Sequence, residues 1–87
     1  MKYLSSIKNP ELKRLRILSQ KSRERKKQFL FVIEGLRELK KALAGGYTVC
    51  SLFIEEKYEL EFENITQTLF KSDQYLVSNK VFEQISF

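Results

Sequence analysis

The hydrophobic positions alternate along the chain between helical spacing and short continuous runs. Leucines recur three residues apart after Asn9-Pro10-Glu11, a strong helix start in which Asn is a preferred N-cap and Pro fits the first helical position. Residues 29–33 (Phe-Leu-Phe-Val-Ile) carry no charge and are aromatic, β-branched or leucine, a pattern typical of a strand buried on both faces. We expect this strand in the middle of a sheet, with the basic segment before it lying outside.

The rest of the chain continues the alternation. Gly35 allows a sharp turn into a helix, and Gly45-Gly46 ends that helix. The predicted strands are residues 29–33, 49–54 and 75–77, and the predicted helices begin at residue 10 and span 21–27, 36–44, 59–70 and 80–85. Such alternation predicts an α/β fold, with helices packed on a mostly parallel central sheet. The positions expected to face the core are Leu12, Leu15, Leu18, Leu36, Leu39, Leu43, Phe62, Ile65, Leu69, Val81, Phe82 and Ile85.

Length and composition narrow the class of protein. A chain of 87 residues is one small domain, or a fragment of a larger protein. With no His and one Cys, Cys50, neither a disulfide framework nor a zinc site is expected, and the commonest general base is missing. No apolar run approaches the roughly 20 residues that span a bilayer, and the N-terminus lacks a signal-peptide apolar core. We therefore expect a cytoplasmic protein that does not interact with membranes.

The charge is divided unevenly between two parts of the chain. Residues 1–28 hold ten Lys and Arg against two Glu, a net +8, whereas residues 29–87 hold six against nine acids, a net −3. Such a division is typical of a face that binds a polyanion. The charge alone leaves three interpretations open: a nucleic acid, an acidic partner, or a solvated basic helix surface. The candidate RNA-binding residues are Lys13, Arg14, Arg16, Lys21, Arg23, Arg25, Lys26 and Lys27.

Several short motifs occur in a recognisable order. The opening Leu4-Ser5-Ser6-Ile7-Lys8-Asn9-Pro10 is followed by basic residues, by Arg25 six residues before Phe31, and then by Phe31-Val32-Ile33-Glu34-Gly35 with Arg37. Later matches are Leu52-Phe53-Ile54-Glu55, Val77-Ser78, Val81-Phe82 and Ile85-Ser86. In this order and spacing the chain resembles the N-terminal substrate-binding domain of the SpoU/TrmH-type RNA 2′-O-ribose methyltransferases. Arg25 holds the motif position and is the best single candidate for RNA contact.

The resemblance implies an L30e-like α/β fold, RNA (ribosomal or transfer) as partner, and a catalytic domain C-terminal to Phe87. That domain would bind S-adenosylmethionine and methylate a ribose 2′-hydroxyl, and homodimerisation of the full-length protein stays open. The cofactor motifs of the family, E-G-x-G and I-P-M…S-L-N-V-S, do not occur in this chain. On this interpretation residues 1–87 are a single RNA substrate-binding domain, which alone neither binds the methyl donor nor catalyses transfer.

The other motif residues have structural explanations. For Asn9, N-capping is favoured over contact with RNA through the side-chain amide; Pro10 fits the helix start, and Gly35 is a backbone turn residue. Glu34 is expected to pair with Arg37 or Arg25, or to accept backbone N–H groups at the next helix start.

Core packing is favoured over base stacking for two of the aromatic residues, Phe29 and Phe31, which share one face of the predicted strand. Tyr3, Tyr47 and Tyr58 lie near element ends, where stacking on bases is open to them. Cys50 is expected to be an inert buried thiol.

Two further functions are consistent with the sequence. One is a stand-alone RNA-binding protein of the L30e-like ribosomal class. The other is a module for dimerisation or for docking onto a catalytic domain. A DNA-binding helix-turn-helix is disfavoured because strands alternate with helices.

Overall fold

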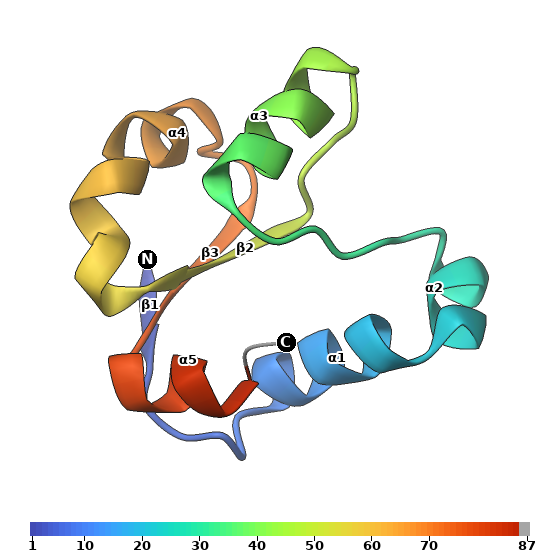
Figure 1. The fold of residues 1–87 in the computed structure, drawn as a ribbon, viewed down its shortest axis with the longest axis horizontal. Coiled ribbons are helices and arrows are strands. Elements are labelled where there is room, and N and C mark those ends of the chain that lie inside the picture. Colours follow the sequence, from blue (N-terminus) through green and yellow to red (C-terminus); the bar gives the residue numbers. More distant parts are fainter. Residues whose placement is uncertain (86–87) are drawn as a thin grey trace.

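A sheet of three parallel strands lies between two layers of helices in the computed structural model, which describes residues 1–85 (Figure 1). Strand β3 is central, with β1 and β2 at its sides. The elements are β1 (Lys2–Leu4), α1 (Pro10–Gln20), α2 (Ser22–Gln28), α3 (Leu36–Ala44), β2 (Ser51–Glu55), the 3₁₀ helix η1 (Glu56–Phe62), α4 (Glu63–Thr68), β3 (Asp73–Val77) and α5 (Asn79–Ile85). The predicted α/β class and parallel sheet are confirmed. Ser86, a part of the resemblance, lies outside the described residues.

One face of the sheet packs against α1 and α5 and forms the main core. Tyr75 and Val77 alternate along β3 with more exposed positions, as expected for side chains that point to opposite faces of a strand. The Tyr75 ring stacks on Phe53 of β2 with centroids 4.9 Å apart, and burial raises the pKa of the Tyr75 hydroxyl. The cluster consists of Leu4, Leu12, Tyr75, Val77, Val81 and Ile85.

The opposite face is covered by α3 and α4 (Figure 1). Gln74 of β3 holds α4 in place, because its Nε2 donates to the carbonyl oxygens of Thr66 at 2.9 Å and Leu69 at 2.8 Å. Leu39 of α3 and Ile54 of β2 are almost fully buried. Helices on both faces make this a small three-layer domain.

The structure confirms the predicted start of α1 and both predicted ends of α3, where a capping residue or a glycine indicated the end. The Asn9 Oδ1 accepts the backbone N–H of Glu11 at 2.9 Å, and α1 begins at the next residue, Pro10. Gly35, with φ 100°, precedes α3, and Gly46, with φ 86°, follows it. Both φ values favour glycine, which has no Cβ to clash with the backbone. Within residues 1–85, no helix combines the length and the apolarity needed to cross a membrane.

The predicted central strand at residues 29–33 is wrong. Phe29 instead takes a left-handed conformation that ends α2, and Leu30 donates its backbone N–H to the Arg25 carbonyl at 3.0 Å. The run continues in extended form without strand pairing, and Phe31 and Ile33 are exposed. The start of the apolar run is used to close a helix, so its first residues do not join the sheet.

Smaller differences concern the strands and one helix. In place of the predicted strand at residues 29–33, the sheet contains β1, a three-residue strand that the sequence pattern did not predict. Strand β2 begins at Ser51, so Cys50 lies before it and is exposed, contrary to expectation. The helix predicted at residues 59–70 is divided into η1 and α4. Its expected inward residues, Phe62, Ile65 and Leu69, are half-buried.

Replacing Leu12 tests the core. Leu12 has no exposed surface, so we expect Leu12→Ala to lower the free energy of unfolding by about 2–5 kcal/mol through lost burial and a residual cavity. Ile17 lies on the same helix but is 43% exposed, so Ile17→Ala is the matched control and should cost within about 0.5 kcal/mol. Urea unfolding followed by circular dichroism measures both, and equal losses would contradict this core.

Candidate nucleic-acid interface

The eight predicted RNA-binding residues all lie on α1, on α2 or at the junction between them. Helix α1 carries Lys13, Arg14 and Arg16, Lys21 precedes α2, and α2 carries Arg23, Arg25, Lys26 and Lys27. Six of the eight are exposed, whereas Arg16 and Arg25 are half-buried. Within residues 1–85 the ion pairs are Lys41–Glu38 and Lys57–Glu55, so none of the eight is neutralised by an acid. The charge of the six exposed residues is therefore available to an anionic partner.

Helix α2 has two different faces. Arg23, Lys26 and Lys27 are exposed, and we call them the outer α2 face. Glu24, Arg25 and Gln28 are half-buried and form the inner face. The division follows the helical repeat, because residues three and four apart lie on the same side. Three of the four cations of α2 thus point to solvent together.

The Arg25 side chain bridges α2 to the end of α1. Its Nη1 donates to the carbonyl oxygen of Leu18 at 2.7 Å and to that of Ser19 at 3.0 Å. Carbonyl groups in the last turn of a helix lack partners within the helix, so the guanidinium supplies donors where they are needed. These two contacts give Arg25 a structural role that does not require RNA, although its motif position made it the strongest single candidate for RNA contact.

Further polar contacts hold the same two helices together. The Arg14 Nη2 donates to the Gln28 Oε1 at 3.2 Å, and the Gln28 Nε2 donates to the Glu24 Oε2 at 3.4 Å. No residue of α2 is buried. Helix α2 is therefore attached to the body by hydrogen bonds and not by a hydrophobic face. Figure 1 shows it beyond the end of α1, away from the sheet.

Phe29 directly follows the outer α2 face. It ends α2 with φ 56° and ψ 39°, and its side chain is 93% exposed. Its N–H bonds to Lys26, together with that of Leu30 to Arg25, complete a Schellman motif, in which glycine is the usual left-handed residue. A left-handed residue with a side chain costs about 1–2 kcal/mol. The prediction that Phe29 packs in the core is wrong, and the only sequence signal against it was its place immediately after a short polar helix.

The extended segment after Phe29 lines an open cleft with the end of α1. The cleft has a volume of about 350 Å³ and is lined by Ser19, Arg25, Phe31, Val32, Ile33 and Glu34. The Phe31 ring meets Tyr47 edge to face, with centroids 5.1 Å apart, so it is only partly covered. Glu34 and Arg37 are exposed. The expected ion pair of Glu34 with Arg37 or Arg25 does not form, and Glu34 does not cap α3.

The three candidate tyrosines are spread over the molecule. The Tyr3 hydroxyl donates to the Glu56 Oε2 at 3.1 Å, and this hydrogen bond raises the pKa of Tyr3. Tyr47 contacts Phe31, and the Lys57 Nζ lies 5.3 Å from the Tyr58 ring centroid. Because each already has a partner and none lies on α1 or α2, they do not extend the basic surface.

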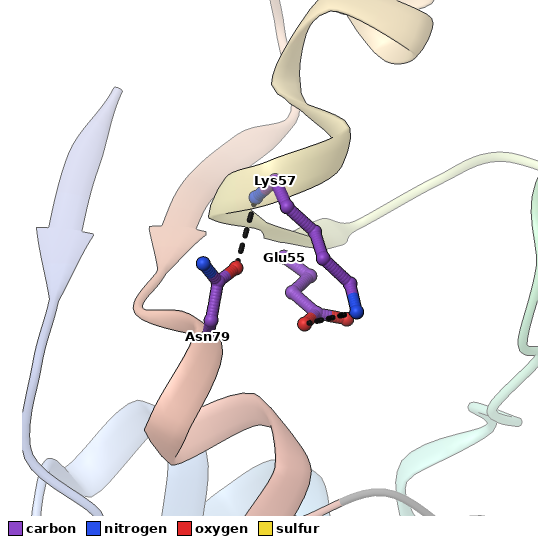
Figure 2. Close-up of polar contacts among 3 residues, drawn as sticks. All are labelled: Glu55, Lys57 and Asn79. Carbon is purple, nitrogen blue, oxygen red and sulfur yellow. Dashed lines mark hydrogen bonds and ion pairs between the residues drawn. The ribbon is translucent and has the colours of Figure 1, made fainter.

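A second polar cluster lies at the carboxyl end of β2 (Figure 2). Glu55 is 8% exposed, and its Oε2 lies 3.5 Å from the Lys57 Nζ without a hydrogen-bond partner in the described residues. The Lys57 backbone N–H donates to the Asn79 Oδ1 at 2.9 Å, which ties η1 to the start of α5. A buried carboxylate needs a nearby cation, and Lys57 provides one. We therefore assign this cluster a structural role.

Comparison with known protein families identifies the chain as a whole. The MRM3-like substrate binding domain matches residues 9–87, a range that contains both basic helices and every other helix and strand except β1. The chain belongs to this family. The match supports the substrate-binding domain of a methyltransferase, with RNA binding as its context, which confirms the coarser part of the interpretation from sequence. Searches of curated proteins and of solved structures gave no match.

Removing the Arg25 guanidinium tests how α2 is attached. We expect Arg25→Ala to lower the free energy of unfolding by about 1–2 kcal/mol, because two carbonyl oxygens of α1 lose a charged donor. Arg23→Ala removes the same charge from the outer α2 face and should cost within about 0.5 kcal/mol. Urea unfolding of both variants decides the matter. If the two cost the same, Arg25 does not have this structural role.

Proposed function

We propose that this chain is the RNA-recognition domain of an S-adenosylmethionine-dependent RNA 2′-O-ribose methyltransferase of the SpoU/TrmH type. The family match supports the substrate-binding role, and the motif order from Asn9-Pro10 to Glu34-Gly35 supports the finer assignment. The domain would hold ribosomal or transfer RNA through phosphate contacts and shape, and would present the target ribose to a separate catalytic domain.

The observation that carries this proposal is the set of unneutralised cations on α1 and α2. Phosphates attract Lys and Arg side chains that have no acidic partner, and each contact releases a counterion from the nucleic acid. The outer α2 face meets this requirement at three positions, because Arg23, Lys26 and Lys27 are exposed and make no ion pair within residues 1–85. Arg25 contributes by positioning α2, since its donors contact α1.

We propose that methyl transfer is carried out by a separate catalytic domain, which the resemblance implies to be C-terminal to Phe87. The residues around the cleft beside Arg25 do not fit S-adenosylmethionine, because the lining contains no glycine-rich turn. We therefore derive no step of the reaction from this chain. A cytoplasmic location and homodimerisation of the full-length protein belong to the same proposal.

Charge reversal of the outer α2 face tests the RNA contact. We expect Arg23→Glu/Lys26→Glu/Lys27→Glu to weaken binding to a structured ribosomal RNA fragment. The slope of log affinity against log salt should fall by about 2–3, since each lost phosphate contact removes about 0.7–0.9. Filter binding over a range of salt concentrations measures both quantities. The circular dichroism spectrum should stay that of the wild type, because no residue of α2 is buried.

The matched control is Lys40→Glu/Lys71→Glu/Lys80→Glu, which makes the same change in net charge at exposed positions outside α1 and α2. We expect it to retain most of the affinity and of the salt slope. Equal losses in the two triple variants would mean that net charge and not the outer α2 face determines binding.

A docking module is a second candidate, favoured by exposed apolar side chains on another part of the molecule. Leu60 of η1 is 83% exposed and Phe70, after α4, is 76% exposed. Surfaces that meet a protein partner are typically contiguous apolar patches, and these two side chains are candidates for belonging to one. This function predicts a molar mass that rises with concentration in light scattering and falls back in Leu60→Ser/Phe70→Ser. A constant mass together with RNA binding would favour the first proposal.

A further inference from the structure

Phe29 has two unfavourable features, an exposed aromatic side chain and a left-handed backbone. Its side chain is 93% exposed, although burial of a Phe side chain away from water stabilises a protein. Its backbone, with φ 56°, lies in the region that favours glycine. It is the only residue other than glycine with a positive φ among residues 1–85. The Schellman motif that ends α2 accounts for the left-handed backbone, but packing within the described part of the chain does not explain a large aromatic side chain at this position.

Strained backbone positions occur most often at functional sites, where the strain serves a task other than stability. Glycine at position 29 would remove the strain and the exposed ring together. The aromatic ring is therefore the feature that needs an explanation. The ring projects from the end of α2, next to positively charged side chains.

The neighbours of Phe29 indicate the kind of partner. Lys26 and Lys27 precede it, and with Arg23 they form the outer α2 face, which no acid neutralises within residues 1–85. A partner that covers Phe29 therefore meets positive charge within one helical turn. It must combine negative charge with a flat apolar surface at short spacing.

Unpaired nucleotides have this combination, because each phosphate is followed by a base with an accessible face. Inside an RNA duplex the bases are stacked on each other and present only their edges, so only the two end pairs of a blunt duplex have an open face. A membrane surface would need an apolar stripe along the helix, and α2 (Ser22–Gln28) contains no apolar residue before Phe29.

We propose that Phe29 stacks on an unpaired base of the RNA while Arg23, Lys26 and Lys27 hold the flanking phosphates. This inference rests on the proposed function and makes it more specific. The recognised element is a loop, a bulge or another single-stranded segment, and not a continuous duplex. The left-handed backbone of Phe29 sets the direction of its Cα–Cβ bond, and Arg25 holds the helix from whose end the side chain projects.

The test compares two RNA probes and two variants. The probes are an RNA hairpin with an unpaired loop and a blunt duplex with the same stem sequence. Phe29→Gly removes the ring and relieves the backbone, whereas Phe29→Tyr keeps a ring in the same place. We expect Phe29→Gly to weaken hairpin binding by about 5- to 150-fold and to leave duplex binding unchanged, since stacking on one base is worth about 1–3 kcal/mol. Phe29→Tyr should bind the hairpin like the wild type.

Thermal unfolding separates this effect from loss of structure. Phe29→Gly should have a midpoint no lower than that of the wild type, because glycine adopts a positive φ without steric cost. A stable Phe29→Gly protein with an unchanged ratio of hairpin to duplex affinity would overturn the stacking role and leave the proposed function standing. A wild-type chain that binds neither RNA at low salt would overturn both. Binding to anionic lipid vesicles that depends on Phe29, with no preference for the hairpin, would also overturn it, with a membrane as the partner.

Discussion

The contact between the Arg25 guanidinium and the end of α1 determines where the proposed RNA-binding residues lie. Its Nη1 donates to two carbonyl oxygens that follow one another in the chain, those of Leu18 and Ser19. The carbonyl of Arg25 in turn accepts the N–H of Leu30, which closes α2. One residue therefore joins α1 to α2 through its side chain and ends α2 through its backbone. The direction of the outer α2 face and of Phe29 depends on both contacts.

This arrangement separates stability from binding. The core around Val77 and Leu12 is built from the sheet, α1 and α5, and α2 contributes no buried residue to it. Like charges at positions 23, 26 and 27 repel one another, because residues three and four apart on a helix are neighbours. The polar contacts of Arg25 and Gln28 offset this repulsion in the free domain. In the proposed complex the phosphates would lie between these cations and replace their repulsion by attraction. The same residues that destabilise the isolated helix would then favour RNA binding.

The parts of the fold that were predicted correctly depend on short-range chemistry. Asn9 caps the first helix because its side chain meets an N–H two residues away, and Gly35 and Gly46 have φ values that are costly for other residues. Leucine spacing placed Leu12 and Leu18 in the core for a similar reason, since the helical repeat is a local property. The eight cations are close together in the sequence, and the structure has them on α1, on α2 and at the junction between these helices. Their contact with RNA stays a prediction.

The error at residues 29–33 shows what composition leaves undecided. Phe29 and Phe53 both lie in apolar runs, yet Phe53 stacks on Tyr75 in the core and Phe29 is exposed. A strand exists only where another strand offers its backbone groups, and that pairing is made across the whole chain. The sequence by itself determined the helix ends marked by Asn9, Gly35 and Gly46, the leucine faces and the uneven charge, because these depend on residues within one or two turns. Only the tertiary structure decided which apolar run enters the sheet, which arginine holds a helix and which aromatic ring faces solvent. Each of these depends on a partner that lies far away in the sequence or at the end of a neighbouring element.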